Sequence, residues 1–140
     1  MKKRNFIIAT AFAGLFSTTA PASAASLTLY CSADEAWCQV MARGFEEETG
    51  IKVDMTRKSS GETFAQIKAE GSNPKGDVWW GGTGDPHLQA AEENLTEAYV
   101  SPMRGELNEW AIRQAVSAAD RTIGIYSGAL GFGYNSDLLK

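Results

Sequence analysis

Two serines, a glycine and an acid stand together in the stretch "SSGE", directly before an amphipathic run. Ser59 and Glu62 match a capping box, in which the serine hydroxyl accepts from the amide of Glu62 and the carboxylate reaches back to Ser59. The same place predicts an anion site, because the first amides of a helix lack partners and carry partial positive charge. Ser60 and Thr63 would add hydroxyl donors, and Gly61 would let an oxyanion approach the backbone.

The neighbouring charges do not decide between these two interpretations. Arg57 and Lys58 would add positive charge if they point inward, which favours an anion. Glu62 would compete with the anion for the same donors, which favours the plain helix cap. The stretch by itself therefore leaves the cap and the anion site equally open.

A second set of small residues, "GGTGD", precedes another amphipathic run. Gly81, Gly82 and Gly84 would make a tight turn of little bulk, and Thr83 would offer a hydroxyl and an amide at a helix start. A simple strand-to-helix turn, with Asp85 as the N-cap and a proline as the first helical residue, also explains the pattern. Two such helix starts in one chain strengthen the case for an anion site.

A third stretch, "CSADE", contributes the hydroxyl of Ser32. The indole of Trp37 is a further candidate contact, but its helical spacing with Val40, Met41 and Phe45 predicts a place in the core. Each of the three stretches needs a strand or a helix beside it to bring it near the others.

Alternating and helical apolar patterns supply those elements. The expected strands are 27–31, 51–55 and 77–82, and the expected helices are 33–50, 59–71, 83–94 and 107–118. Gly50 and Gly71 are well placed to end the first two helices. Phe64 and Ile67 are expected to face inward from the second helix.

The last segment, 121–135, is rich in strand-forming residues and holds four glycines, which predicts one long strand with a bulge or two strands. The alternation of strands and helices predicts an α/β fold with a mostly parallel sheet flanked by helices and right-handed crossovers. In such a sheet ligands bind outside the carboxyl ends of the strands, which lie at one edge. The three polar stretches are therefore expected to converge there.

The first 24 residues predict a secretory signal peptide rather than part of the fold. A basic start, Lys2 to Arg4, precedes a short apolar run and a small-residue cleavage site at 22–24. The run is too short for a membrane span, which needs about 20 residues, although an uncleaved anchor is the alternative. We expect a soluble, monomeric protein exported to the periplasm.

Charge and cysteine content narrow the functional classes. The whole chain has 13 basic and 17 acidic residues; the leader holds three of the basic ones, which leaves 10 against 17 and a net charge of −7. This acidity argues against nucleic acid and anionic membranes as partners, but not against a small anionic solute in a local pocket. Cys31 and Cys38 predict one disulfide in an oxidising compartment. A redox or metal role is less favoured, because the sequence has no C-x-x-C motif.

The sequence shows no recognisable catalytic or cofactor motif. The only histidine, His87, lies early in a predicted helix and is expected at the surface. The acids at 46–48 and 92–93 are typical of solvated helix ends. The sequence contains no Walker loop, no G-x-S-x-G and no H-E-x-x-H motif. No candidate nucleophile has a base beside it in the sequence. We therefore expect neither an enzyme nor a cofactor.

The stretches "FEEETGIKV" and "P-x-G-D-V", following a signal peptide, resemble the periplasmic substrate-binding proteins of ABC transporters. The resemblance covers residues 26–140 and is closest to the group that includes binders of iron(III), phosphonates and phosphorylated small molecules. The segment "TIGIYSGALGFGYNSDLL" is similar to the family's crossover between its two lobes.

This resemblance implies a type II periplasmic-binding-protein fold, in which two lobes close on a ligand. Residues 25–140 would then be an incomplete N-terminal lobe that ends near the first inter-lobe crossover. The implied function is solute capture for import through a membrane permease. The two helix starts favour a phosphorylated or phosphonate-like anion, bound by Ser32, Ser59, Ser60, Gly61, Thr63, Gly82 and Thr83.

Three alternatives remain open at this point. Ferric iron is one, because Glu62 falls near the place where the family's first-lobe carboxylate ligand would lie. An exported enzyme that uses the same fold is another. The third is a sensory or truncated module that binds nothing.

Overall fold

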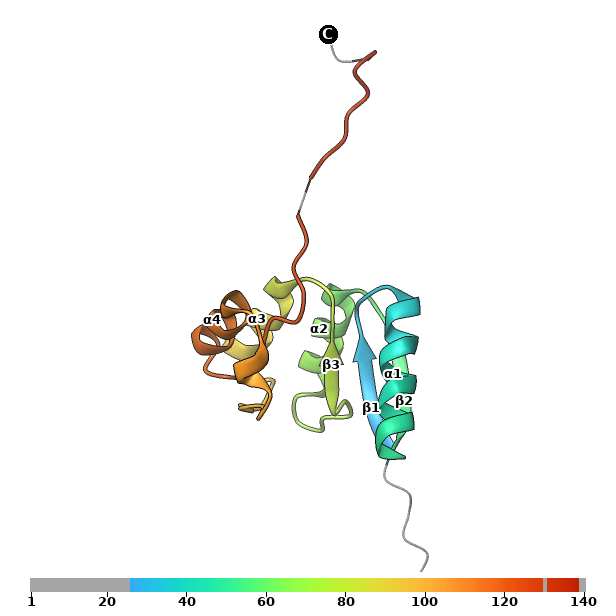
Figure 1. Ribbon diagram of the computed structural model, residues 1–140, viewed down its shortest axis with the longest axis vertical. Coiled ribbons are helices and arrows are strands. Elements are labelled where there is room, and N and C mark those ends of the chain that lie inside the picture. Colours follow the sequence, from blue (N-terminus) through green and yellow to red (C-terminus); the bar gives the residue numbers. More distant parts are fainter. Residues whose placement is uncertain (1–25, 130, 139–140) are drawn as a thin grey trace, which may run out of the picture.

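The computed structural model describes residues 26–129 and 131–138 (Figure 1). The predicted signal peptide, residues 1–24, lies outside them. Along the chain the elements are β1 (Ser26–Cys31), α1 (Glu35–Thr49), β2 (Lys52–Arg57), α2 (Ser60–Glu70), β3 (Val78–Trp80), α3 (Gly84–Glu92), a 3-10 turn (Arg104–Glu106) and α4 (Glu109–Ser117). The expected alternation of strands and helices is confirmed as far as α4.

The three strands form one parallel sheet in the order β2-β1-β3, as predicted for an α/β fold. β1 lies in the middle and pairs along its length with β2, from Ser26 opposite Lys52 to Cys31 opposite Arg57. β3 is short and pairs with the second half of β1, with Trp80 opposite Cys31. All three strands therefore end on the same side of the sheet, which we call the carboxyl edge.

Helix α1 covers one face of this sheet. The Asp34 carboxylate caps its start by accepting from the Ala36 amide at 2.9 Å. Gly50 ends the helix, as predicted, in the left-handed region at φ 72°. The core beneath α1 is small and consists of Leu29, Cys31, Ala33 and Cys38.

Helix α2 covers the opposite face of the sheet. Successive side chains of a strand alternate between faces, so every second residue of β1 points toward α2. Tyr30 points to this side and is 5% exposed. Its hydroxyl donates to the two carboxylate oxygens of Glu70, at 2.9 and 3.1 Å. Phe64 and Ile67 of α2 are half-buried, and α3 packs against α2.

Helices α3 and α4 bury alanines rather than large side chains. Ala90 and Ala91 are buried from α3, and Ala111 and Ala115 from α4. Small residues allow close packing, and the neighbour of α3 is α2. None of the helices in the described part of the chain is long and apolar enough to cross a membrane.

The predicted N-cap of α3 is wrong. The N-cap is Thr83 rather than Asp85, which lies in the first turn, where its charge suits the positive end of the helix dipole. Pro86 is consequently the third helical residue instead of the first. Its missing amide is harmless there, because the amides of the first turn have no acceptor within the helix.

The strands expected in 121–135 are also wrong for the described part of that segment. Phe132 is 92% exposed and Tyr134 66%, and the C-terminal segment (red in Figure 1) runs away from the sheet. A strand is stabilised by side chains packing across a sheet, so strand-forming residues without a neighbouring strand do not make one.

The apolar run of α1 is solvent-exposed, contrary to the prediction from its spacing. Trp37 is 56% exposed, Val40 60% and Met41 48%. Cys38 takes the inward position instead, because its bond to Cys31 turns that side of α1 to the sheet. Since neighbouring residues of a helix are about 100° apart around its axis, Trp37 is rotated outward.

Candidate functional site

The three polar stretches meet at the carboxyl edge, as the parallel topology predicts. Ser32 follows β1, and its hydroxyl lies 3.1 Å from the hydroxyl of Thr63 in α2. Ser60 begins α2, and its hydroxyl accepts from the Thr83 amide, just before α3, at 3.0 Å. Hydrogen bonds thus join the loops that follow all three strands.

The start of α2 is a complete capping box, as predicted. The Glu62 amide donates to the Ser59 hydroxyl at 3.4 Å, and the Ser59 amide donates to Glu62 Oε2 at 3.0 Å. The Ser59 hydroxyl and amide lower the pKa of Glu62, because they stabilise its charged form.

This cap leaves two backbone donors available. The described residues provide no hydrogen-bond partner for the amides of Ser60 and Gly61. A methyl group on Gly61 would meet nothing within 4 Å, so the backbone is open at this point. The capping interpretation is therefore confirmed, and it does not use up the donors that an anion would need.

Thr63 lies beneath the edge rather than on it. Its side chain is 1% exposed, and its hydroxyl is paired with Ser32. Ser32 also accepts from the Trp79 indole at 2.9 Å. Thr63 and Trp79 therefore hold the Ser32 hydroxyl in place, and the expectation that Thr63 faces a ligand directly does not fit its burial.

The turn into α3 depends on its glycines. Gly81 and Gly82 have φ values of 77° and 94°, a region that residues with a side chain disfavour. A methyl group on Gly82 would also lie 2.8 Å from Ser32 Cβ and press against the Ser60 hydroxyl. The absence of a side chain thus lets the Gly82 backbone pack between the loops that follow β1 and β2.

Tyr126, which the motifs missed, also contacts this turn. Its hydroxyl accepts from the Gly82 amide at 2.6 Å and donates to the Gly82 carbonyl at 3.1 Å. In the sequence Tyr126 is one of several strand-forming residues of 121–135. Nothing in the neighbouring letters indicates a contact with a residue 44 positions away.

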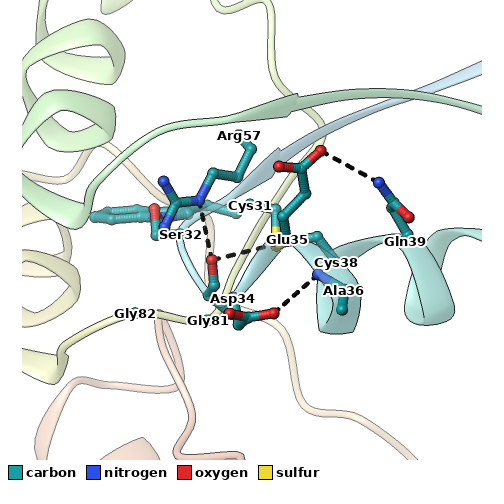
Figure 2. Close-up of a disulfide and its surroundings, with 12 residues drawn as sticks. Cys31, Ser32, Asp34, Glu35, Ala36, Cys38, Gln39, Arg57, Gly81 and Gly82 are labelled. Atoms are coloured by element: carbon teal, nitrogen blue, oxygen red, sulfur yellow. Dashed lines mark hydrogen bonds between the residues drawn. A yellow bond between two sulfur atoms is a disulfide. The ribbon is translucent and has the colours of Figure 1, made fainter.

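The two cations before α2 are held by the protein's own acceptors. Arg57 Nε donates to the Ala33 carbonyl at 3.1 Å, beside the disulfide (Figure 2). Lys58 Nζ donates to Gln66, further along α2. Because both acceptors are neutral, the two cations keep their full charge and help to lower the pKa of Glu62. The positive character of the α2 start therefore comes from these cations together with its backbone amides.

The predicted disulfide between Cys31 and Cys38 is present (Figure 2). It joins the last residue of β1 to the early part of α1, with 6.0 Å between the two Cα atoms. Ser32 directly follows one cysteine, and Trp37 directly precedes the other. The bridge therefore encloses the whole loop between β1 and α1 at the carboxyl edge.

His87 is half-buried, so the expectation of a surface position is wrong. Its ring stacks on the Trp79 indole, with 3.6 Å between ring centroids and 22° between planes. Its Nε2 donates to the Gly81 carbonyl at 2.8 Å. Burial lowers the pKa of His87, and the bond to Gly81 partly opposes that shift. The neutral ring is favoured, and it braces the glycine turn from α3.

An open groove borders the carboxyl edge beside β3. Its lining includes Trp79, Gly82, His87 and Tyr126. Among residues 26–129 and 131–138, no three His, Cys, Asp or Glu side chains are grouped to hold a metal ion. What the edge offers is N–H and O–H donors beside aromatic surface, which suits a polar or anionic organic molecule.

A family model and a curated relative each match most of the chain. The model describes bacterial extracellular solute-binding proteins and matches residues 27–125. An uncharacterised protein of Haemophilus influenzae is 39% identical over 127 residues, which are 91% of this chain and 37% of that protein. The chain thus spans little more than a third of this relative's length.

Solved structures of periplasmic binding proteins are similar as well. AfuA from Actinobacillus pleuropneumoniae, with fructose 6-phosphate bound, is 45% identical with a TM-score of 0.59, over 61% of this chain and 27% of AfuA. P5PA is 32% identical with a TM-score of 0.64, over 69% and 31%. Iron-bound HitA from Pseudomonas aeruginosa is 28% identical with a TM-score of 0.55, over 59% and 27%.

Proposed function

Because this chain belongs to the bacterial extracellular solute-binding protein family, we propose that it captures a small anionic solute for import. The solute is a phosphorylated or phosphonate-like organic molecule, and the partner is the membrane permease of an ABC transporter. The role is binding rather than catalysis, and it needs no cofactor.

The proposal extends to the organisation of the protein. Residues 1–24 are a cleaved signal peptide that directs the chain to the periplasm, where it acts as a monomer. Residues 25–140 belong to the N-terminal lobe of a two-lobed binding protein and reach close to the first crossover between lobes. The similarity to periplasmic binding proteins that are more than twice as long supports this organisation.

The observation that carries the proposal is the pair of available amides at Ser60 and Gly61. An anion at this point would meet the first turn of α2, where the partial positive charge of the helix favours it. The Ser60 hydroxyl, which accepts from the Thr83 amide, retains its own proton to donate. AfuA, the similar protein with fructose 6-phosphate bound, supports a phosphate as the anionic group.

The other candidate residues have distinct proposed roles around this anion. Ser32 and Thr83 present hydroxyls from the neighbouring loops, and Gly82 lets the backbone come close. Ser59 holds the helix end through its bonds with Glu62. Thr63 acts beneath the edge, by keeping the Ser32 hydroxyl in place.

Ferric iron is a second candidate, supported by the similarity to iron-bound HitA. The ligand from this chain would be Glu62. Its Oε2 atom accepts from the Ser59 amide at 3.0 Å and from the Ser59 hydroxyl at 2.7 Å. A metal ion would have to compete with both bonds and weaken the cap of α2, so the geometry favours the anion.

An NMR titration of the isotope-labelled chain with fructose 6-phosphate tests the proposal. The amide signals of Ser60 and Gly61 should shift saturably, whereas fructose, which lacks the phosphate, should leave them in place. No movement with fructose 6-phosphate, or equal movement with fructose, would refute the anion site. Ferric citrate that broadens the Glu62 signal, with no response to the phosphate compound, would favour iron.

A pair of serine variants tests whether the Ser60 hydroxyl contacts the anion or only links the two helix starts. Ser60→Ala should weaken fructose 6-phosphate binding by about fivefold, the effect of one hydrogen bond. Ser72→Ala, at an exposed serine in the turn after α2, is the matched control and should bind like the wild type. If the Ser60→Ala chain is folded and its affinity is unchanged, Ser60 only links the two helix starts.

A further inference from the structure

Three aromatic side chains from separate parts of the chain meet near the carboxyl edge. The ring of Tyr126 contacts Trp37 of α1 edge-to-face, with centroids 5.9 Å apart and planes at 87°. It also contacts Trp80 of β3, with centroids 6.3 Å apart. We refer to these three residues, Trp37, Trp80 and Tyr126, as the aromatic wall.

The aromatic wall keeps a large apolar surface in contact with solvent. Trp37 is 56% exposed and Tyr126 39%, although each touches another ring. A single exposed aromatic residue is ordinary, but contiguous rings beside convergent polar groups are typical of a ligand site. Trp80 and Tyr126 also line the open groove beside β3.

Tyr126 connects the aromatic wall to the candidate anion site. Its hydroxyl bonds both the amide and the carbonyl of Gly82. Gly82 in turn packs against Ser32 and Ser60, the hydroxyl-bearing residues of the neighbouring loops. Gly82 therefore links the apolar surface to the loops that carry the polar donors.

We infer that the aromatic wall receives the uncharged body of the solute while the Ser60 and Gly61 amides hold its phosphate. This inference rests on the proposed function and narrows it to a phosphorylated sugar. The C–H surface of a sugar ring packs well on an aromatic ring, which removes apolar area from water. Inorganic phosphate or a bare metal ion has no such surface and would leave Trp37 unused.

The NMR signals of the tryptophan indole N–H groups test this inference directly. The chain has four of them, and each indole N–H gives its own NMR signal. Fructose 6-phosphate should move the Trp37 and Trp80 signals along the same saturation curve as the Ser60 amide. Inorganic phosphate should move the Ser60 amide alone. The amide of Gly50, which ends α1 away from the carboxyl edge, serves as the internal reference for both probes.

Two variants of α1 test the energetic contribution of the aromatic wall. Trp37→Ala should weaken binding of fructose 6-phosphate by about tenfold and leave inorganic phosphate unaffected. Val40→Ala, at a residue that is 60% exposed on the same helix, is the matched control and should change neither affinity. If Trp37→Ala lowers the thermal stability, Trp37→Leu keeps apolar bulk without the ring and should show the same selective loss.

The outcomes distinguish this inference from the proposed function. If fructose 6-phosphate moves the Ser60 amide but neither indole, or if Trp37→Ala binds both probes like the wild type, the aromatic wall takes no part and the anion site stands. If neither probe moves the Ser60 amide, the proposed function and this inference fail together.

Discussion

The starts of α2 and α3 use the same kinds of residue in different ways. α2 is capped from within, by the reciprocal bonds of Ser59 and Glu62. Thr83, the N-cap of α3, makes no side-chain capping bond. The amides that lead into α3 are bonded instead by hydroxyls from other elements, the Gly82 amide by Tyr126 and the Thr83 amide by Ser60.

This difference shows how a helix start can be both stable and available. Because α2 satisfies its own end with two residues, the amides of Ser60 and Gly61 can stay unpaired without unravelling the helix. The start of α3 is built by its neighbours, so its geometry depends on packing across the carboxyl edge. The two starts should therefore respond differently to substitution and to pH.

The largest expected loss of stability comes from changing the turn that leads into α3. Gly82→Ala should lower the free energy of unfolding by about 3 kcal/mol, because a methyl group disfavours the positive φ and overpacks the site. Gly84→Ala is the control, since nothing lies within 4 Å of the added methyl group. Urea denaturation should find this control neutral or up to about 1 kcal/mol more stable. Equal stabilities for both variants would show that the packing at Gly82 is unimportant.

A smaller effect separates the two N-caps. Ser59→Ala should cost about 1 kcal/mol of unfolding free energy, because it removes the capping bond to the Glu62 amide. Thr83→Ala should change the free energy by less than about 0.5 kcal/mol, since that side chain makes no capping bond. Chemical denaturation of the two variants side by side checks the contrast, which disappears if both lose the same amount.

The smallest effects concern pH, and they fall in different windows. Burial lowers the pKa of His87 from its usual 6.5, so its contribution to stability is complete above pH 6.5 and is lost as pH falls through the lower folded-state pKa. The bonds from Ser59 lower the pKa of Glu62 from 4.5, so its contribution is lost only below pH 4.5. The α3 start should therefore weaken first on acidification.

Urea midpoints measured against pH check these windows. His87→Gln should flatten the curve just below pH 6.5, and Glu62→Gln should flatten it below pH 4.5 and nowhere else. A His87→Gln chain whose midpoints fall as steeply as those of the wild type below pH 6.5 would contradict the first assignment.

Sequence patterns predicted the features that depend on nearby residues. The S-x-x-E capping box acts across three residues, so its letters are sufficient to place it. Gly50 ends α1 as expected, because a left-handed residue after a helical run favours glycine. The meeting of Ser32, Ser60 and Thr83 followed from topology, since parallel strands end at one edge of a sheet.

The features that patterns missed depend on packing between distant residues. Trp37 points outward because the bond of Cys38 to Cys31 turns the Cys38 side of α1 toward the sheet. The stack of His87 on Trp79 and the contact of Tyr126 with Gly82 have no local signature. Strand propensity in 121–135 did not predict a strand, because pairing requires a neighbour that local letters do not specify.

The bond between Cys31 and Cys38 also bears on the entropy of recognition. It closes a short loop whose first and last residues are Ser32 and Trp37. Both residues are therefore restricted when the chain folds, before any solute arrives. Ordering a side chain on binding typically costs about 0.5–1.5 kcal/mol, and a preorganised loop avoids part of that loss. The disulfide can thus raise the affinity for a solute that it does not itself contact.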